Sequence, residues 1–585
     1  MQEVAKMREL MAVALGEEEA DLAIVNAQVV NVYTREVLKG SSILVKGERI
    51  AYVGPNPPRA IGSKTRVIDA QGKVVIPGFI DGHTHIFSIC SLEEVVRYAI
   101  LGGTTTIITE LAEVANPLGY GVLGELIKVS RGQAIKLFFT LPPMGSISQT
   151  LKKHAITARE LRRLLKEREV IGLGESYWAQ VIGGDERQLK LISEVKKMGG
   201  KVEGHSSGAR GSKLQAYIST GISSCHEPIE SSEVLERLRL GLYVLVREGE
   251  VRRELEAISK IKDEKVSFRR LVLSTDGLSP KEYIRDGYMD FVVQKAIGLG
   301  WEPLLAIQMA TLNVAQHFCL DDFLGGIAPG KYADMLIIPD LETIKPEYVI
   351  SNGRVVAQGG RLLEQIRKPD YPEALKASIK LPRDFTSEDF LLPVANGRSV
   401  KVRVIRQVTD LLTQEEVIEL PLEDGKLMVD TARDIVKVAA IERTYLPGKT
   451  FVGLIKGLGL KSGAIATSTS WDCSAIIVVG ANEADMAGAV NRVKRLGGGI
   501  VVYAKSRVLS ELALPLGGIF STEPMEVLER KMAQLQEAGS SLGCRSSDIR
   551  LTISVLSTSA IPYLRICEDG LFNIRENRLV SFIVG

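Results

Sequence analysis

The sequence predicts an α/β protein in which a (β/α)8 TIM-like barrel is combined with a split β-sandwich domain and a C-terminal α+β domain. Short apolar runs alternate with helical patterns between residues 71 and 324, β-rich segments flank that region on both sides, and the composition changes after about Pro369. With 585 residues and 45% hydrophobic content, the chain can build about two to four domains with substantial cores.

Residues 1–70 are expected to hold a helix and the first part of the sandwich. MQEVAKMRELMAVALGEEEA reads as a charged amphipathic helix, without the apolar core and small-residue cleavage site of a signal peptide. From Asp21 to about Ile68, β-rich runs alternate with turn residues, which predicts hairpins. A similar pattern returns in residues 325–370, in ADMLIIPDL and YVISNGRVVAQGG. The two segments are therefore expected to complete one sheet around an inserted domain.

Residues 71–324 are expected to form the barrel. Eight strand-like runs alternate there with helical patterns: VVIPGFIDGH, TTTIIT, IKLFFT, VIGLGES, KVEGH, GISSCH, GLYVLVRE and RLVLSTD. Repeated βα units of this number predict a closed parallel sheet covered by helices. Thr157 and Glu160 have the spacing of a capping box, which marks the start of one helix.

Residues 380–585 are expected to form the separate α+β domain. Its predicted strands are DIVKVAAIER, AIIVVG, GIVVYA and RLTISVLS, and NEADMAGAVNRVKRLG is a predicted helix. KPDYPEALKASIKLPRD is expected to link this domain to the preceding part, because it is rich in proline and lysine.

The composition excludes several classes of protein. The formal net charge is only +2, and no basic run is interleaved with aromatic residues, so nucleic acid is not an expected partner. The sequence contains no stretch of about 18 uncharged apolar residues, so no membrane span is predicted. The six cysteines form no CxxC pair, which favours reduced thiols and a cytoplasmic protein.

Side chains that can bind metal ions stand at the ends of five predicted strands: His83, His85, Glu175, His205, His226 and Asp276. The carboxyl ends of barrel strands meet on one face, so these side chains are expected to converge. His83 and His85 lie two residues apart on a strand and therefore point to the same side. Imidazole and carboxylate ligands suit Zn, Fe, Mn or Co. Glu175 could bridge two metals, and Asp276 could also accept a proton from an activated water.

Each of these residues also has a purely structural explanation. A single strand-end histidine is usually a packing or surface residue. Four of the six histidines on one predicted face favour a metal site instead. His154 and His317 are interpreted as surface or packing residues, and Cys225 as a core residue. Asp81 could orient a ligating histidine or simply cap its strand.

Several motifs resemble known proteins. PGFIDGHTH and GGIAPGKYADMLII resemble the amidohydrolase superfamily, whose members are metal-dependent hydrolases. A closer resemblance, to the adenine deaminase family, extends over nearly the whole chain. It rests on GTTTIITELAEVANPLG, GLGES, EGHSSGARGSKLQAYISTGISSCHE, YVLVREG and STDG, and on VKVAAIER, FVGLIKGLGLKSGAIA, IIVVGANEADMAGAVNRV and GGGIVV in the C-terminal part.

The resemblance implies hydrolytic deamination of adenine to hypoxanthine and ammonia at a centre of two divalent ions, Mn or Fe, with Zn as a further candidate. Glu175 stands where many relatives carry a carboxylated lysine. Water activated at the metals would attack C6 of the purine, Asp276 would pass its proton to the leaving amine, and Glu113 would protonate a ring nitrogen. Four further positions are expected to bind the heterocyclic substrate: Glu110, Ser176, Trp471 and Asp472. Assembly into a homo-oligomer is left open.

Positions outside the predicted metal ligands depart from the family pattern. Where the family has Asp-Pro-His before the proton-donating glutamate, this chain has Glu-Leu-Ala at 110–112, and the family's His-Asp-Ser-His-Asn run appears as Trp-Asp-Cys-Ser-Ala at 471–475. A site that loses such polar groups discriminates differently between substrates. Action on another cyclic amidine or amide and a non-catalytic paralogue therefore stand beside adenine deamination. A deacetylase of the N-acetylglucosamine-6-phosphate type is a third alternative, because it also uses a strand-four glutamate with two histidines and an aspartate.

Overall fold

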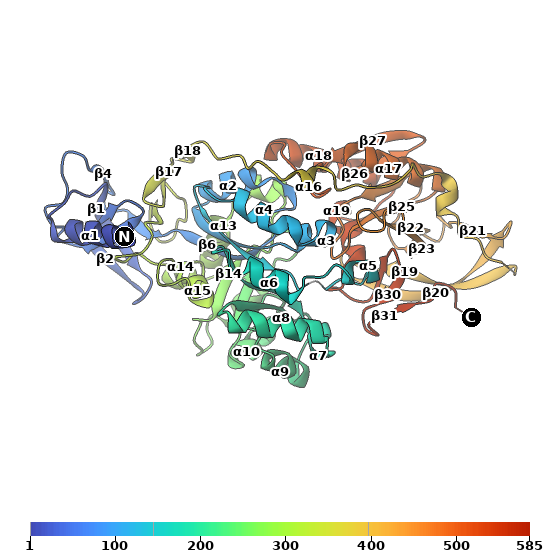
Figure 1. Ribbon diagram of the computed structural model, residues 1–585, viewed down its shortest axis with the longest axis horizontal. Helices are drawn as coiled ribbons and strands as arrows, with labels where there is room; N and C mark the ends of the chain where they lie inside the picture. Colours follow the sequence, from blue (N-terminus) through green and yellow to red (C-terminus); the bar gives the residue numbers. More distant parts are fainter. Residues whose placement is uncertain (1, 144, 396, 585) are drawn as a thin grey trace.

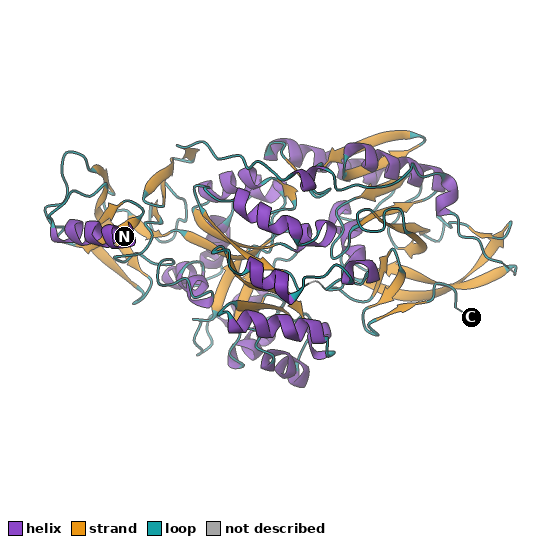
Figure 2. Cartoon of the chain, in the orientation of Figure 1, coloured by secondary structure: helices purple, strands orange, loops and turns teal. Residues whose placement is uncertain are grey.

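The computed structural model describes residues 2–143, 145–395 and 397–584. The chain is elongated, with a β-rich part at the N-terminal end, a central part of strands and helices, and a C-terminal part at the opposite end (Figure 1). Helices surround the strands of the central part (Figure 2). No helix within the described ranges has both the length and the apolar character that a membrane span requires.

The central part contains the parallel strands predicted from the sequence. Within the described ranges they form one sheet of five strands and one of three, and every pairing in both is parallel. In sheet order the strands are β11 (Lys201–His205), β10 (Val170–Tyr177), β9 (Lys136–Leu141), β8 (Thr104–Glu110) and β6 (Phe79–Thr84), then β12 (Ser224–Cys225), β13 (Tyr243–Arg247) and β14 (Leu271–Ser274). The mixed α/β architecture is confirmed, whereas the predicted single barrel is found as these two sheets.

Helices follow these strands along the chain. They are α2 (Leu92–Leu101), α3 (Ala112–Leu118), α4 (Gly121–Val129), α5 (Gln149–Lys152), α6 (Ala158–Leu164), α7 (Trp178–Ile182), α8 (Glu186–Lys197), α9 (Gly211–Ser219), α10 (Ser231–Arg239), α11 (Leu255–Ile258), α12 (Pro280–Arg285), α13 (Met289–Gly298), α14 (Pro303–Met309) and α15 (Leu312–His317). The capping box predicted at α6 is present: the Thr157 side chain accepts from the backbone N–H of Glu160, whose carboxylate accepts from that of Thr157.

The sheet at the N-terminal end combines segments from before and after the central part. In order, its strands are β18 (Arg361–Leu362), β17 (Arg354–Gln358), β16 (Tyr348–Ser351), β15 (Met335–Ile338), β5 (Val74–Pro77), β1 (Leu22–Asn31), β2 (Glu36–Lys46) and β3 (Arg49–Gly54), with β4 (Arg66–Asp69) beside β1. β5 and β15 are antiparallel, with Ile76 opposite Leu336. The prediction that two distant segments complete one sheet is therefore confirmed. The predicted N-terminal helix is α1 (Gln2–Leu15).

The C-terminal part is built on a larger sheet. Its strands, in order, are β21 (Lys426–Leu427), β20 (Thr413–Glu423), β19 (Ser399–Gln407), β23 (Thr450–Lys456), β22 (Ile435–Glu442), β25 (Ala475–Gly480), β24 (Ala464–Thr467), β26 (Gly499–Ala504) and β27 (Arg507–Ala513). The predicted helix is α17 (Glu483–Leu496), which starts where the Asn482 side chain accepts from Asp485 N and ends at Gly497 with φ 72°. Its remaining elements include α18 (Met525–Ser541) and the small sheet of β29 (Leu564–Cys567), β30 (Gly570–Asn573) and β31 (Arg578–Val580).

The predicted strand RLTISVLS is wrong. These residues form α19 (Ile549–Ser554), followed by a 3₁₀ turn over Val555–Ser557. The helix starts because the Asp548 side chain accepts from the backbone N–H of Leu551. Nearly every side chain of the segment is buried, and a short run that is apolar or buried all round does not distinguish a strand from a helix by its periodicity.

The C-terminal part is attached directly to the central part. β28 (Phe520–Ser521) pairs in parallel with β7 (Ile89–Cys90), and Ile89 N donates to Ile519 O at 3.0 Å. β7 follows His85 closely in the chain. This pairing therefore brings loops of the C-terminal part to the carboxyl ends of the parallel strands.

Candidate active site

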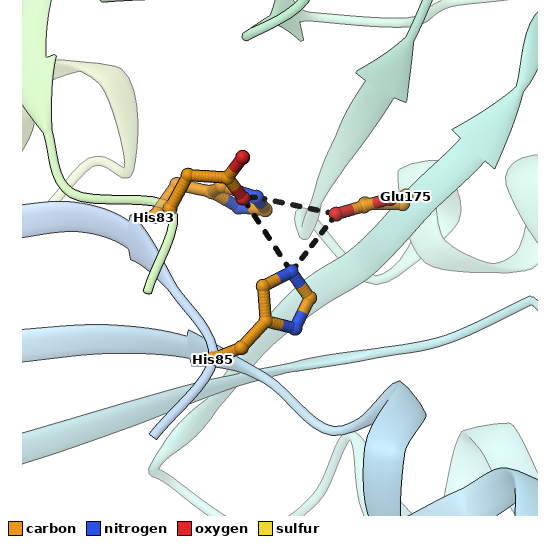
Figure 3. A group of neighbouring side chains, drawn as sticks. His83, His85 and Glu175 are labelled. Carbon is orange, nitrogen blue, oxygen red and sulfur yellow. Dashed lines mark hydrogen bonds and ion pairs between the residues drawn. The ribbon is translucent and has the colours of Figure 1, made fainter. Parts of the chain in front are cut away.

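The six predicted metal ligands lie together at the carboxyl ends of the parallel strands. Two groups have ligand atoms that all lie within 4.8 Å of one another: His83, His85, Glu175 and Asp276, and Glu175, His205 and His226. Glu175 belongs to both. Figure 3 shows the side chains of His83 and His85 meeting the carboxylate of Glu175. The convergence expected from the strand assignment is thus present.

Glu175 occupies the centre of the cluster. Its Oε1 lies 3.2 Å from His83 Nε2 and 3.2 Å from His85 Nε2, and its Oε2 lies 3.0 Å from His205 Nδ1. His226 Nε2 is 3.6 Å from Oε1. One carboxylate thus faces all four histidines, with Oε1 toward His83, His85 and His226 and Oε2 toward His205, and a carboxylate shared by both groups is suited to bridging two ions.

The electrostatics of the cluster favour bound cations. Burial alone would lower the pKa of His83, but the Asp276 and Glu175 carboxylates outweigh burial and raise it to about 10. Burial would raise the pKa of Asp276, yet His83 and the Arg247 charge lower it to about 2. Carboxylates that remain ionised inside the protein need positive partners. Without bound metal, protonated imidazoles balance the charges of these carboxylates, and a divalent ion can replace the protons.

Imidazole nitrogens that form no hydrogen bond also indicate a divalent metal site. His83 Nε2 and His205 Nε2 are buried and form no well-oriented hydrogen bond among the described residues, although carboxylate oxygens lie 3.2 Å and 3.6 Å from them. Buried polar atoms are rarely left without partners. Four imidazoles and two carboxylates are ligands that divalent Mn, Fe and Zn accept. A divalent metal site is therefore the interpretation that satisfies these groups.

Two charged residues behind the cluster were missed by the sequence prediction. Arg247, at the end of β13, donates from Nη1 to Asp276 Oδ2 at 3.1 Å and to Glu227 Oε1 at 2.5 Å. It also pairs with Glu254. Glu227 Oε1 in turn lies 3.3 Å from His226 Nε2. The sequence signal for Arg247 is its position at the end of a strand. It was not predicted as a site residue, because arginine does not bind metal ions.

A pocket with about 620 Å³ of empty space, part of it open to solvent, adjoins the cluster. His85 and Glu175 line it on the side of the parallel strands, and Trp471 and Asp472 line it on the side of the C-terminal part. The Trp471 ring centroid is 5.7 Å from that of His85. Asp472 Oδ1 accepts from Tyr177 OH at 3.1 Å. The C-terminal part therefore supplies an aromatic surface and a fixed carboxylate beside the cluster.

Glu113, for which the sequence predicts a role as proton donor, lies beside His85. Its Oε2 is 3.2 Å from His85 Nδ1, and it lines the same pocket. The carboxylate contacts the side of the His85 ring opposite the nitrogen that faces Glu175. Glu113 is thus positioned both to orient that imidazole and to reach a molecule in the pocket.

Neither Glu110 nor Ser176 is among the described residues that line this pocket. Ser176 lies between Glu175 and Tyr177 on β10, so its side chain points to the opposite face, where its hydroxyl donates to Gly174 O at 3.2 Å. Glu110 Oε2 accepts from the backbone N–H of Glu175 at 3.0 Å. Glu110 therefore helps to position Glu175 through its backbone.

Comparisons with known proteins identify the family of this chain. The model of the amidohydrolase family matches residues 74–356, and that of the adenine deaminase C-terminal domain matches residues 410–578. An adenine deaminase of Desulforamulus reducens is 35% identical over 590 residues, spanning 100% of this chain and 99% of that protein. One from Clostridium botulinum strain Langeland is 35% identical over 582 residues, 98% of this chain and 97% of that protein. Among solved structures, N-acetylglucosamine-6-phosphate deacetylase from Pasteurella multocida has a TM-score of 0.46 at 18% identity, covering 58% of this chain and 100% of that one.

Parallel strands that carry a His-x-His pair, two further histidines and two carboxylates at their carboxyl ends define a hydrolase of the amidohydrolase superfamily. The similarity over the full length is more specific. The chain belongs to the adenine deaminase family.

Proposed function

We propose that this protein hydrolyses adenine to hypoxanthine and ammonia. The observation that carries the proposal is the cluster of four histidines and two carboxylates beside a pocket that the C-terminal part completes. Two relatives that are similar over nearly the full length are adenine deaminases, and residues 410–578 of this chain match the adenine deaminase C-terminal domain.

We infer that two divalent ions, Mn or Fe with Zn as a further candidate, are held by His83, His85, Glu175 and Asp276 and by Glu175, His205 and His226. Ions held there would supply Lewis-acid chemistry, acidifying water and stabilising negative charge. Glu175 would be shared between them. Glu175 and Asp276 would offset two of the four positive charges of such a pair of ions.

The side chains around the pocket then have separate tasks. Asp276, whose Oδ2 is held by Arg247, keeps Oδ1 toward the cluster and accepts the proton of the attacking water before passing it to the leaving amine. Glu113 donates a proton to a ring nitrogen of the heterocycle. Trp471 stacks on the ring of the substrate, and Asp472 accepts a hydrogen bond from the substrate.

Action on a different cyclic amidine or amide is the second candidate. The pocket is lined by Ala112 and Trp471 at positions where the family pattern noted above has histidines. A neutral indole and a methyl group cannot replace the hydrogen bonds of imidazoles. The same hydrolytic residues would then serve another ring system.

The deciding experiment is ammonia release from adenine by protein loaded with Mn or Fe, with a panel of purines, pterins and hydantoins in parallel. We expect turnover of adenine, about two equivalents of bound metal, and a lower Tm after chelation, because a ligand that binds only the folded state stabilises it. Turnover of another heterocycle but not of adenine would support the second candidate. Near-zero metal without turnover would contradict both.

Arg247 gives a more local test. The substitution Arg247→Lys keeps the buried charge but loses the fork that holds Asp276 and Glu227, so kcat should fall about 10–100-fold, as for other residues that orient metal ligands. KM and metal content should change little. Arg270→Lys is the control, because Arg270 donates to Gly241 O outside the cluster. An unchanged kcat in Arg247→Lys would show that the contact has no catalytic role.

We also infer that the two parallel sheets close into one (β/α)8 barrel. Ser223 N, next to β12, donates to Val202 O of β11 at 2.9 Å, and Asp276 N, after β14, donates to His83 O of β6 at 3.0 Å. These bonds join the outer strands of the two sheets on both sides. The proposed domains remain 1–70 and 325–370 for the sandwich, 71–324 for the barrel and 380–585 for the C-terminal domain.

A further inference from the structure

Arg443, which directly follows β22, is a buried cation that lines the pocket beside the metal cluster. Its side chain is 1% exposed. Nη1 donates to Ser378 O at 3.2 Å and Nη2 donates to Gly517 O at 2.9 Å, while Nε has no hydrogen-bond partner within the described ranges. None of the ion pairs in the described part of the chain includes Arg443. No described carboxylate therefore forms an ion pair with Arg443, and the neighbouring Glu442 acts on it only from a longer distance.

Arg443 remains charged in spite of its burial. Burial lowers its pKa to about 10, which still leaves the guanidinium protonated at neutral pH. A buried charge without a partner is costly, and buried charges in proteins are normally paired. An arginine of this kind beside an active-site pocket is explained if a ligand supplies the missing negative charge.

Arg565 shows how the same chain satisfies an arginine with a structural role. It is also fully buried and also lacks a carboxylate partner in the described residues. Yet all three of its nitrogens donate to backbone carbonyls: Nε to Ile561 O at 2.7 Å, Nη1 to Val555 O at 3.1 Å and Nη2 to Leu411 O at 2.8 Å. Arg565 does not line the pocket. Arg443 differs in both respects.

Neighbouring groups extend the site. Arg550, 5% exposed, lines the same pocket; it pairs with Glu250, but its Nε has no hydrogen-bond partner among the described residues. Ser468 lines the pocket and donates to Gly518 O at 2.7 Å, next to the carbonyl that Arg443 binds. Asn116, 3% exposed, presents an Oδ1 that is likewise without a partner there. The pocket thus offers unused cationic donors and one unused acceptor.

We propose that Arg443, assisted by Arg550, forms an anion-binding subsite of this pocket, and that the preferred substrate is an amino-substituted heterocycle that carries a carboxylate or phosphate group. The inference rests on the proposed function, because hydrolytic deamination of the ring is retained. Guanidinium groups bind both kinds of anion through charged hydrogen bonds. Asn116 accepts an N–H of the ring. Repulsion from Asp472 is limited, since its oxygens already accept from Tyr177 and Thr558.

Binding of inorganic phosphate tests the subsite directly. Calorimetric titration is made on the full chain, once loaded with metal and once stripped of metal, so that phosphate held by the metal ions is separated from phosphate held by arginine. We expect saturable binding in both forms and a loss of affinity of about tenfold or more in Arg443→Met, with Arg443→Lys in between. Arg383→Met removes an exposed arginine of the same C-terminal part and should bind like the unmodified protein.

Turnover of acidic substrates is the second arm. Adenine is compared with adenines that carry a carboxymethyl or a phosphonomethyl group on a ring nitrogen, which separates carboxylate from phosphate recognition. At least one acid should exceed adenine in kcat/KM by about tenfold, and Arg443→Met should abolish that advantage. Thermal unfolding checks that each variant is folded, and Arg550→Met replaces Arg443→Met if the latter is not.

The outcomes separate the two proposals. Phosphate affinity that is unchanged in Arg443→Met, or a preference for adenine over every acid, overturns the anion subsite and leaves adenine deamination intact. Absence of ammonia from adenine and from all acids overturns the proposed function. In that case the titration of metal-stripped protein still decides whether Arg443 binds an anion.

Discussion

Replacing Asp276 by asparagine should lower kcat for adenine by about 1,000-fold, within the range that a positioned proton acceptor contributes. The amide has the same shape and can still offer an oxygen to the cluster, but it cannot accept and return a proton. Asp276 Oδ1 lies 3.3 Å from His83 Nε2, and Arg247 holds Oδ2. We therefore expect metal content and KM to change little while kcat falls, which steady-state kinetics and elemental analysis of the same preparation would show.

The control for this substitution is Asp290→Asn. Asp290 is also largely buried in the central part of the chain, but it accepts from Tyr288 N at 2.8 Å, away from the cluster. It should leave kcat nearly unchanged. A loss in Asp276→Asn that is matched by loss of metal would assign the residue a ligand role alone, and an unchanged kcat would remove it from the mechanism.

Replacing Glu175 by glutamine should have the second large effect, by removing the charge shared by both ligand groups. Glutamine keeps the length of the side chain, but it lacks the negative charge that faces all four histidines. Bound metal should fall well below the level of the unmodified protein, and kcat should fall about 1,000-fold or more, because Lewis-acid stabilisation worth several kcal/mol is lost. Metal analysis and ammonia release measure the two effects.

A matched substitution in another buried histidine–glutamate pair is available. Glu203 pairs with His317 Nε2 at 2.9 Å inside the central part, and His317 is 1% exposed. Glu203→Gln should lower stability, since it weakens a buried ion pair, but should keep the bound metal. If Glu175→Gln retains its metal and most of its activity, the central role assigned to Glu175 is wrong.

The metal ligands could be predicted from the sequence because the alternation of strands and helices and the period of two along a strand suffice to place them. Apolar runs alternating with helical patterns imply parallel strands, and residues at the carboxyl ends of such strands share one face. His83 and His85 then point the same way because strand side chains alternate with a period of two. The same alternation, applied to β10, places Ser176 on the face opposite to Glu175 and Tyr177, which line the pocket, and its substrate-binding role stays a prediction.

Other features needed information that no local pattern contains. The segment that follows Asp548 was predicted as a strand because its β-branched residues look the same in a buried helix, and only packing on all sides decides between them. Substrate binding by Glu110 stays a prediction, and its hydrogen bond with the backbone N–H of Glu175 could not be read from the sequence. Arg247 was passed over because its importance comes from the carboxylates around it.

The sequence by itself therefore determined the order of the parallel strands in the central part, the joining of two distant segments into one sheet, and the set of six groups able to bind metal. Only the tertiary structure decided what stands opposite that set. Trp471 lies beside His85, and Arg443 lies buried in the same pocket without an ion pair among the described residues, because the pairing of β28 with β7 sets the C-terminal part over the strand ends. Periodicity along the chain specifies which way a side chain points, whereas contacts between remote segments depend on how whole surfaces pack together.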